Sequence, residues 1–341
     1  MKKKVVACLL AGTMAMSLTA CGGGGVSSNS SSGKGDSKEA STADKEVGVE
    51  QTAEPQAPPE DAPVGGQFVV QIAPGSLSPD MMDGWSANAT NTGFIRLMNG
   101  YGLTDITRER VKEWDPVVVK SHEETDNEDG SRTYTITIND NLKWNDGSKI
   151  TAKDYVFHIL LRSSKQFAEC EGDATMGSTL VGFDTFREGK TKEFTGVRLL
   201  GEYEFSFTVA AENLPDYYIL DSIGFEPAPM AAIAPEVEIK DDGNGCYLND
   251  KFTTDLLRKT LLDPETGFRY KRPVVCGPYQ LKKVDIGTET VEIEINKEYL
   301  GRYDGTTPHI EKIISKPVAT ETWRDEFEKG TVDFFKTSKG E

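Results

Sequence analysis

The stretch YTITINDNLKWNDGSKITAKDYVF, residues 134–157, contains three structural signals in a fixed order. Between Tyr134 and Ile138, large apolar residues alternate with threonine, which is the period of a half-buried strand. Asp146-Gly147 predicts a tight hairpin turn, since glycine takes a positive φ freely. Thr151 then begins a helix as its N-cap, and Asp154 is placed to accept its backbone N–H. We therefore predict a strand, a hairpin and a helix in succession.

Outward from this stretch, strand and helix signals are interspersed along the chain. β-branched and aromatic residues at short spacing predict further strands at 67–72, 117–119, 197–209 (a hairpin), 277–281, 291–295, 310–316 and 332–335. Helical spacing predicts helices at 94–98, 215–223, 250–261 and 320–328, whereas 76–92 reads as an irregular loop. This mixture predicts a mixed α/β (α+β) fold class.

The N-terminus carries the signals of an exported protein. Lysines follow Met1, an apolar run extends from Val5 to Leu18, and small residues precede Cys21. Such a pattern is typical of a secretory signal peptide, and the run is too short to span a bilayer as a helix. Leu-Thr-Ala-Cys at this place resembles a bacterial lipobox, in which the cysteine is lipidated and becomes the new N-terminus. We predict a signal peptide over 1–20 and lipidation at Cys21, with an ordinary secretory signal as the alternative.

Residues 21–64 are predicted to be a disordered tether. The segment after Cys21 is rich in Gly and Ser, then in Ala, Glu and Pro, and it has no aromatic residue. It cannot bury enough apolar surface to offset its chain entropy. A flexible linker of about 40 residues reaches roughly 35 Å. The remaining stretch, 65–341, is long enough for two subdomains or one large domain.

Charge and cysteine content narrow the classes of partner. The formal net charge is −17, and loss of the three lysines with residues 1–20 makes it −20. An acidic surface argues against nucleic acid and against adsorption to anionic lipid headgroups. Beyond the signal peptide and Cys21, the chain keeps Cys170, Cys246 and Cys276. Since exported proteins form disulfides, we consider a bond between Cys246 and Cys276.

No catalytic or metal-binding motif is present in the sequence. His122, His158 and His309 are far apart, and for His158, within a predicted helix, we expect a packing or surface role. Gly-x-Ser-x-Gly, P-loop and Cys-x-x-Cys motifs are missing. The acidic turn 126–130 does not match calcium-loop spacing, and 243–248 lacks the last glycine of a dinucleotide loop. We therefore expect neither enzymatic activity nor a cofactor.

Residues 134–157 resemble the peptide/nickel family of extracellular solute-binding proteins of ABC importers. That family has a strand, then Leu-Lys-Trp-x-Asp-Gly, then Thr-Ala-x-Asp-Val-x-Phe, in the order found here. Gly277-Pro278-Tyr279 followed by 294–299 is similar to the family's Gly-Pro-Tyr strand and Asn-x-x-Tyr segment. Residues 310–313 and 327–333 resemble a later run that ends in Gly-x-x-Asp. With 66–99 also fitting in order, the resemblance covers essentially 65–335.

The resemblance implies a periplasmic-binding-protein-like type II lobe with an inserted subdomain. It places the core at about 65–91 and 196–341, and the inserted subdomain at about 92–195. Family members have two lobes that close on a ligand, and the Gly-x-x-Asp run lies where the chain crosses into the second lobe. Because the sequence stops at Glu341, we expect the second lobe to be absent from this chain.

The resemblance further implies capture of short peptides outside the cell and their delivery to the permease subunits of an ABC transporter. The protein is expected to be a monomer, lipid-anchored on the extracytoplasmic face of the cell membrane, at the cell surface or in the periplasm. Polar loop atoms beside an aromatic wall would form the cleft. The expected ligand contacts are Ser76, Leu77, Ser78, Trp85, Asn88, Phe334, Phe335, Lys336 and Thr337. Alternatively, Trp85 and Phe335 are core aromatics.

Two other functions remain open at this stage. Within the same family, the solute could instead be a nickel chelate, an oligosaccharide or heme, although three scattered histidines disfavour direct nickel ligation. From a different class, a single lobe could serve as a surface interaction or signalling lipoprotein that binds a protein partner.

Overall fold

The computed structural model describes residues 62–85, 88–214 and 216–335. The chain divides into two units, Met1–Asp61 and Ala62–Glu341, and the described residues all belong to the second. The predicted signal peptide, Cys21 and the tether as far as Asp61 lie outside the described residues, as do Lys336 and Thr337.

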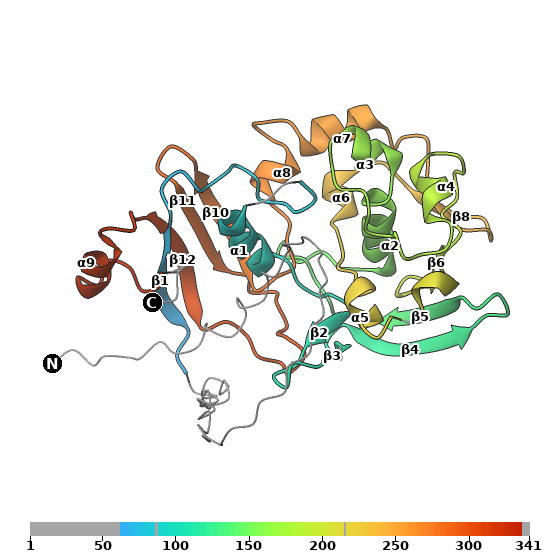
Figure 1. The fold of residues 1–341 in the computed structure, drawn as a ribbon, viewed down its shortest axis with the longest axis horizontal. Coiled ribbons are helices and arrows are strands. Elements are labelled where there is room, and N and C mark those ends of the chain that lie inside the picture. The colour runs from blue at the N-terminus through green and yellow to red at the C-terminus, as the bar shows by residue number, and fades with distance from the viewer. Residues whose placement is uncertain (1–61, 86–87, 215, 336–341) are drawn as a thin grey trace, which may run out of the picture. The chain divides into compact units, whose positions relative to one another are not determined.

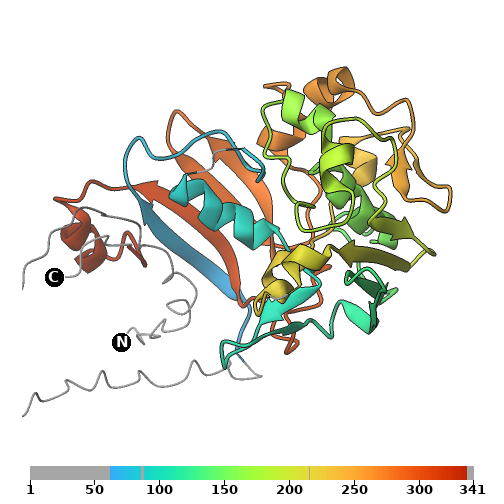
Figure 2. The same ribbon diagram turned by 45° about the vertical axis from the view of Figure 1, so that its right-hand side comes forward.

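The first sheet joins the two ends of the described chain. Its order is β1-β12-β11-β10, with β1 and β12 parallel and the other pairs antiparallel. The bounds are β1 (Gly65–Ile72), β10 (Tyr279–Asp285), β11 (Thr290–Ile295) and β12 (Ile310–Pro317). Helix α1 (Ala89–Met98) lies against one face of this sheet (Figures 1 and 2). Phe94 and Met98 of α1 pack there with Tyr279 and Ile293, so the four predicted strands share one apolar core.

Helix α1 begins five residues before the predicted start at Phe94. The side chain of Asn88 is the reason, since its Oδ1 accepts a hydrogen bond from Asn91 N at 2.8 Å and caps the helix. The segment 76–92, which the sequence predicts to be a loop, therefore contains the first turn of α1.

The second sheet contains the strand of residues 134–138. Its order is β4-β5-β7-β6, all antiparallel. The bounds are β4 (Val119–Asp126), β5 (Arg132–Ile138), β6 (Val197–Leu199) and β7 (Glu204–Val209). In β5, Tyr134, Ile136 and Ile138 are buried, which confirms the predicted alternation. The hairpin predicted at 197–209 is confirmed as β6 and β7.

Helix α2 (Ala152–Leu161) packs beside this second sheet and confirms the predicted capping box. The Asp154 carboxylate accepts the backbone N–H of Thr151 at 2.9 Å. Nearly every residue of α2 is buried, because helices cover the side that faces away from the sheet. Figure 1 shows α3, α6 and α7 around it.

Shorter elements complete the described chain. The remaining strands are β2 (Thr104–Ile106), β3 (Lys112–Trp114), β8 (Ile239–Asp241) and β9 (Cys246–Leu248). The remaining helices are α3 (Lys165–Glu169), α4 (Phe183–Arg187), η1 (Ala211–Asn213), α5 (Ile219–Ser222), α6 (Met230–Ile233), α7 (Thr254–Leu261), α8 (Phe268–Lys271) and α9 (Trp323–Glu328).

The expected domain division assigns residues 196–341, and with them β6 and β7, to the same core as residues 65–91. The strand pairing instead joins β6 and β7 to the other part of the chain. β7 pairs with β5 of the expected inserted subdomain. The physical reason is aromatic packing, since Phe205 stacks on Tyr155 and Phe207 on Tyr134, each with ring centroids 5.5 Å apart.

The short hairpin predicted around Asp146-Gly147 is present: Lys143 bridges Lys149, Trp144 N donates to Ser148 O at 2.9 Å, and Ile150 N donates to Leu142 O at 3.0 Å. Two smaller predictions need correction. The strand predicted at 332–335 is reduced to one parallel bridge between Val70 and Phe334. Cys246 and Cys276 are not bonded to each other: both are free and buried, as is Cys170, and Cys276 Sγ instead contacts Gly100 O at 3.3 Å.

Candidate functional site

The loop that follows β1 is held in shape by the asparagines at the start of α1. Asn91 is fully buried, accepts from Ser78 N at 3.0 Å and donates to the carbonyl oxygens of Ser78 and Asp80. Asn88 donates to Ser76 O, and Leu77 is buried in the core of the first sheet. Of the predicted contacts, Ser76, Leu77, Ser78 and Asn88 therefore lie together, and several of their atoms serve the loop itself.

Trp85 anchors the far end of the same loop. Its indole N–H donates to Cys170 O at 2.9 Å, which uses the single donor of the ring. The ring packs 4.9 Å from Phe167, and the Arg269 guanidinium lies 4.5 Å from its centroid. These contacts tie the loop to α3 and to the segment around α8.

Of the second group of predicted contacts, Phe334 and Phe335 are among the described residues. Phe334 O accepts from Gln71 N of β1 at 2.7 Å. Phe335 stacks on Trp323 with centroids 3.8 Å apart. Phe334 thus lies next to β1, and Phe335 packs against α9.

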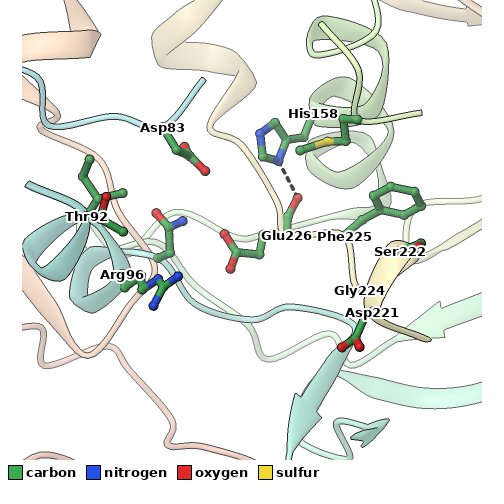
Figure 3. A pocket seen from close by; sticks show the side chains of 12 residues that line it. Asp83, Thr92, Arg96, His158, Asp221, Ser222, Gly224, Phe225 and Glu226 are labelled. Carbon is green, nitrogen blue, oxygen red and sulfur yellow. Dashed lines mark hydrogen bonds between the residues drawn. The ribbon is translucent and has the colours of Figure 1, made fainter. Parts of the chain in front are cut away.

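A cavity of about 450 Å³ opens between the loop, α1, α2 and the segment that follows α5 (Figure 3). Its charged groups are Asp83 from the loop, Arg96 from α1, Asp221 from α5 and Glu226, and the buried imidazole of His158 from α2 lies among them. Its apolar lining comes from Ile95, Met176 and Phe225. Of the predicted contacts that the structure describes, none lines this cavity, although Asp83 lies in the same loop as Trp85.

Three arginines fix the part of the loop that carries Asp83. Arg269 Nε contacts Asp80 Oδ1 at 2.6 Å, Arg272 Nη1 donates to Met81 O at 3.1 Å, and Arg162 Nη1 lies 3.9 Å from Asp83 Oδ2. Arg162 also packs against Gly84, where φ is +106° and an added Cβ would lie 3.1 Å from the guanidinium carbon. These contacts fix the backbone that precedes Asp83, and its carboxylate lies beside Arg162.

The charges of the cavity differ from those of isolated side chains. Burial, and then the charge of Arg162, lowers the pKa of His158 to about 4, so the ring is neutral at pH 7. Burial, and then the neighbouring Asp83, raises the pKa of Glu226 to about 7. Partial burial opposes ionisation of Asp83, but its cationic neighbours, Arg272 and Arg162 among them, hold its pKa below the ordinary value.

The size and lining of the cavity are suited to binding a small ligand. Within the described ranges, no three His, Cys, Asp or Glu side chains are grouped to hold a metal ion. No helix among those residues has the length and apolarity needed to cross a membrane. A cavity of a few hundred cubic ångströms with a few convergent polar groups is the usual form of a small-ligand site.

Sequence reasoning missed most of the cavity wall. Asp83, Arg96 and Glu226 come from three separate segments, and none belongs to a motif. His158 is buried as expected for packing, but its ring also lines the cavity.

Comparison with known proteins places this fold. The family model of bacterial extracellular solute-binding proteins, family 5 (middle), matches residues 112–340. The oligopeptide-binding protein OppA of Lactococcus lactis subsp. cremoris (strain SK11) is 26% identical over 191 residues, which are 56% of this chain and 28% of that protein.

Two solved structures share the fold. Lactococcal OppA, complexed with an endogenous peptide in the closed conformation, aligns with a TM-score of 0.56 and 20% identity over 80% of this chain and 46% of its own. AppA from Bacillus subtilis, in complex with a nonapeptide, aligns with a TM-score of 0.54 and 19% identity over 80% and 44%. The predicted mixed α/β, type II binding-protein fold is confirmed. The chain spans less than half the length of each of these proteins.

Proposed function

The chain belongs to the bacterial extracellular solute-binding proteins of family 5, and on that premise we propose that it captures short peptides outside the cell for an ABC importer. The observation that carries the proposal is the family match over 112–340, a range that includes β4, β5 and α2 as well as the strands β10 to β12. Relatives named as oligopeptide-binding proteins support peptides over other solutes.

The mechanism we propose is binding without chemistry. The loop after β1 offers a fixed edge, because Asn91 and three arginines hold its backbone. A preorganised edge of this kind binds a flexible ligand at a lower entropic cost than a mobile loop. Ser76, Ser78, Asn88, Trp85 and the segment 334–337 remain the proposed contacts. Leu77 contributes by anchoring the loop in the core.

Anchoring and delivery complete the proposal. Residues 1–20 direct export, Cys21 carries the lipid, and the tether 21–64 gives the folded part freedom to collect peptide near the membrane. The monomer then hands its peptide to permease subunits. Replacing Cys21 with alanine is expected to move the protein from the membrane fraction to the soluble fraction.

The direct test is retention of peptide by the purified chain. The protein from residue 22 onward is mixed with a pool of dipeptides to pentapeptides, and native mass spectrometry identifies what stays bound. Calorimetry then measures affinity for each retained peptide. A nickel–histidine chelate, an oligosaccharide and heme are added in separate samples. We expect retention from the peptide pool alone.

Each result has a distinct meaning. Retention of one of the other solutes in place of peptide would keep the family assignment and replace the substrate. Retention of nothing, by a chain whose circular dichroism shows a folded protein, would favour the single-lobe interaction role and overturn peptide capture by this chain.

A further inference from the structure

A buried arginine beside the cavity keeps one hydrogen-bond donor unpartnered. Arg272 directly follows α8 and is 9% exposed. Its terminal nitrogens donate to Met81 O and Asn99 Oδ1. Its third kind of donor, the Nε–H, has no acceptor among the described residues. Because a buried donor without a partner carries its full desolvation cost, an acceptor is expected next to Nε.

The Arg272 side chain lines a second, smaller cavity. Its volume is about 20 Å³, and Asp83, Asn99, His158 and Glu226 are among the other residues that line it. The same four residues also line the larger cavity, so the two spaces adjoin. A water molecule needs roughly 10–15 Å³ of such space and two to four polar partners. The smaller cavity therefore has room for one water molecule and for little more.

His158 brings an unpartnered acceptor to this smaller cavity. Its Nδ1 lies 2.8 Å from Glu226 O. A carbonyl oxygen only accepts hydrogen bonds, so Nδ1 carries the proton of the neutral ring, and Nε2 is an acceptor. No described residue donates to Nε2, and Figure 3 shows this nitrogen on the side of the ring that faces Asp83. Arg272 and His158 thus contribute one unpartnered donor and one unpartnered acceptor to the lining of the same small space.

The charges around the smaller cavity limit what can occupy it. The guanidinium of Arg272 compensates the carboxylates of Asp83 and Glu226, and Asn99 donates a hydrogen bond to Glu226. An added cation would be repelled by Arg272, and an added anion would be repelled by the carboxylates. The occupant must therefore be small and neutral, and it must both accept and donate hydrogen bonds.

We propose that one buried water molecule bridges Arg272 Nε and His158 Nε2. The water accepts from the Nε–H, donates one hydrogen to Nε2 and donates the other to a neighbouring carboxylate, which gives the usual number of about three hydrogen bonds. Through Arg272, the bridge also reaches Met81 and Asn99. The water thus ties α2 to the loop after β1, the end of α1 and the segment after α8, whichever solute the larger cavity takes.

The test follows the Arg272 Nε–H by NMR at pH 7 in isotope-labelled protein from residue 22 onward. Arg272→Lys identifies the signal by its loss. We expect NOE and ROE cross-peaks of opposite sign between this proton and water, which distinguish a long-lived bound water from proton exchange. A crystal structure of the same protein should place one water within hydrogen-bond distance of both Arg272 Nε and His158 Nε2.

Histidine variants test the second end of the bridge. His158→Phe removes the acceptor and should abolish the cross-peaks, whereas His158→Gln keeps a side-chain acceptor and should retain them. The matched control is His122→Phe, which changes an exposed histidine of β4 and should leave the cross-peaks unchanged.

Each outcome bears on the bridge. Cross-peaks that show only exchange with bulk water would overturn it, as would a crystal structure in which Nε donates directly to a carboxylate or contacts an ion. Cross-peaks that persist in His158→Phe would show that the water does not bridge to the imidazole. Should His158→Phe fail to fold, the cross-peaks and the crystal structure of the native chain still decide the proposal.

Discussion

The two sheets of this protein are assembled over very different distances along the chain. In the second sheet, β4 and β5 form a hairpin over residues 119–138, and α2 begins at Ala152, 14 positions after the end of β5. In the first sheet, β1 pairs with β12, so that Gly65 lies opposite Ile310. The strands β4 and β5 and the helix α2 are each predicted by residues close to them in the sequence. The pairing of β1, in contrast, depends on β12, near the C-terminal end of the described chain.

The difference bears directly on the site. The cavity lies where the loop after β1 meets α2 and the segment that follows α5, so its wall combines parts of both regions. A motif that is readable in the sequence thus marks the scaffold, and the ligand site arises only when distant segments come together.

The strongest test is a matched pair of core substitutions, Ile136→Ala in β5 and Ile313→Ala in β12. Both side chains are buried, so each change should lower the free energy of unfolding by about 2–5 kcal/mol. Because local contacts form first and Ile313 lies opposite Phe68 of β1, Ile136→Ala should mainly slow folding, and Ile313→Ala should mainly speed unfolding. Stopped-flow kinetics in denaturant measure both rates. If both variants changed the folding and unfolding rates in the same proportion, the two sheets would not differ in their order of formation.

A second prediction concerns the pH dependence that the cavity imposes on stability. The pKa of Glu226 is raised from its ordinary value of 4.5 to about 7, so the unfolded chain loses this proton first as pH rises. Stability therefore falls between about pH 4.5 and pH 7. Glu226→Gln should raise the free energy of unfolding by about 1–3 kcal/mol at pH 8, and by much less at pH 5.

Chemical denaturation at the two pH values checks this prediction. The exposed control Glu212→Gln should change the free energy of unfolding by less than about 0.5 kcal/mol at either pH. Equal effects of Glu226→Gln at pH 5 and pH 8 would contradict the raised pKa.

A third prediction tests the contact between the end of α1 and the start of β10. A Cβ added to Gly277 would lie 2.4 Å from Asn99 O and 2.5 Å from the Met98 carbonyl carbon. Gly277→Ala must push these backbones apart, at a cost of about 1–3 kcal/mol. Gly287 is the control, because a Cβ added there would meet only Asp285 Oδ1, at 3.5 Å, and Gly287→Ala should be nearly neutral by thermal denaturation.

The smallest expected effect is loss of the α1 cap. Asn88→Ala removes the bond to Asn91 N and the bond to Ser76 O, and should cost about 1 kcal/mol. Asn88→Ser can still cap the helix and should recover part of the loss. If the urea concentration at the midpoint of unfolding were unchanged in Asn88→Ala, Asn91 alone would be sufficient to hold the conformation of the loop.

Prediction from sequence succeeded where the deciding contacts are local. The strand at 134–138, the capping box of Thr151 and Asp154, and the antiparallel pair β10 and β11 all have signals within a few residues of each other. The fold class and the family follow from those signals.

Prediction failed where a distant partner decides. The pairing of β7 with β5 depends on aromatic stacking across about 70 residues. The cavity carboxylates have no signal at all, because Asp83 and Glu226 become neighbours only through the packing of α1 and α2. The predicted contacts of the loop after β1 remain predictions.

The parallel pairing of β1 with β12 also has a consequence in time. During synthesis, β1 emerges early but has no partner until residue 310 is made, some 245 residues later. At about 5–20 residues per second, β1 waits roughly 10–50 s on the ribosome before its sheet can close. For the exported protein proposed above, this delay leaves β1 unpaired during the interval in which a translocation channel must receive the chain.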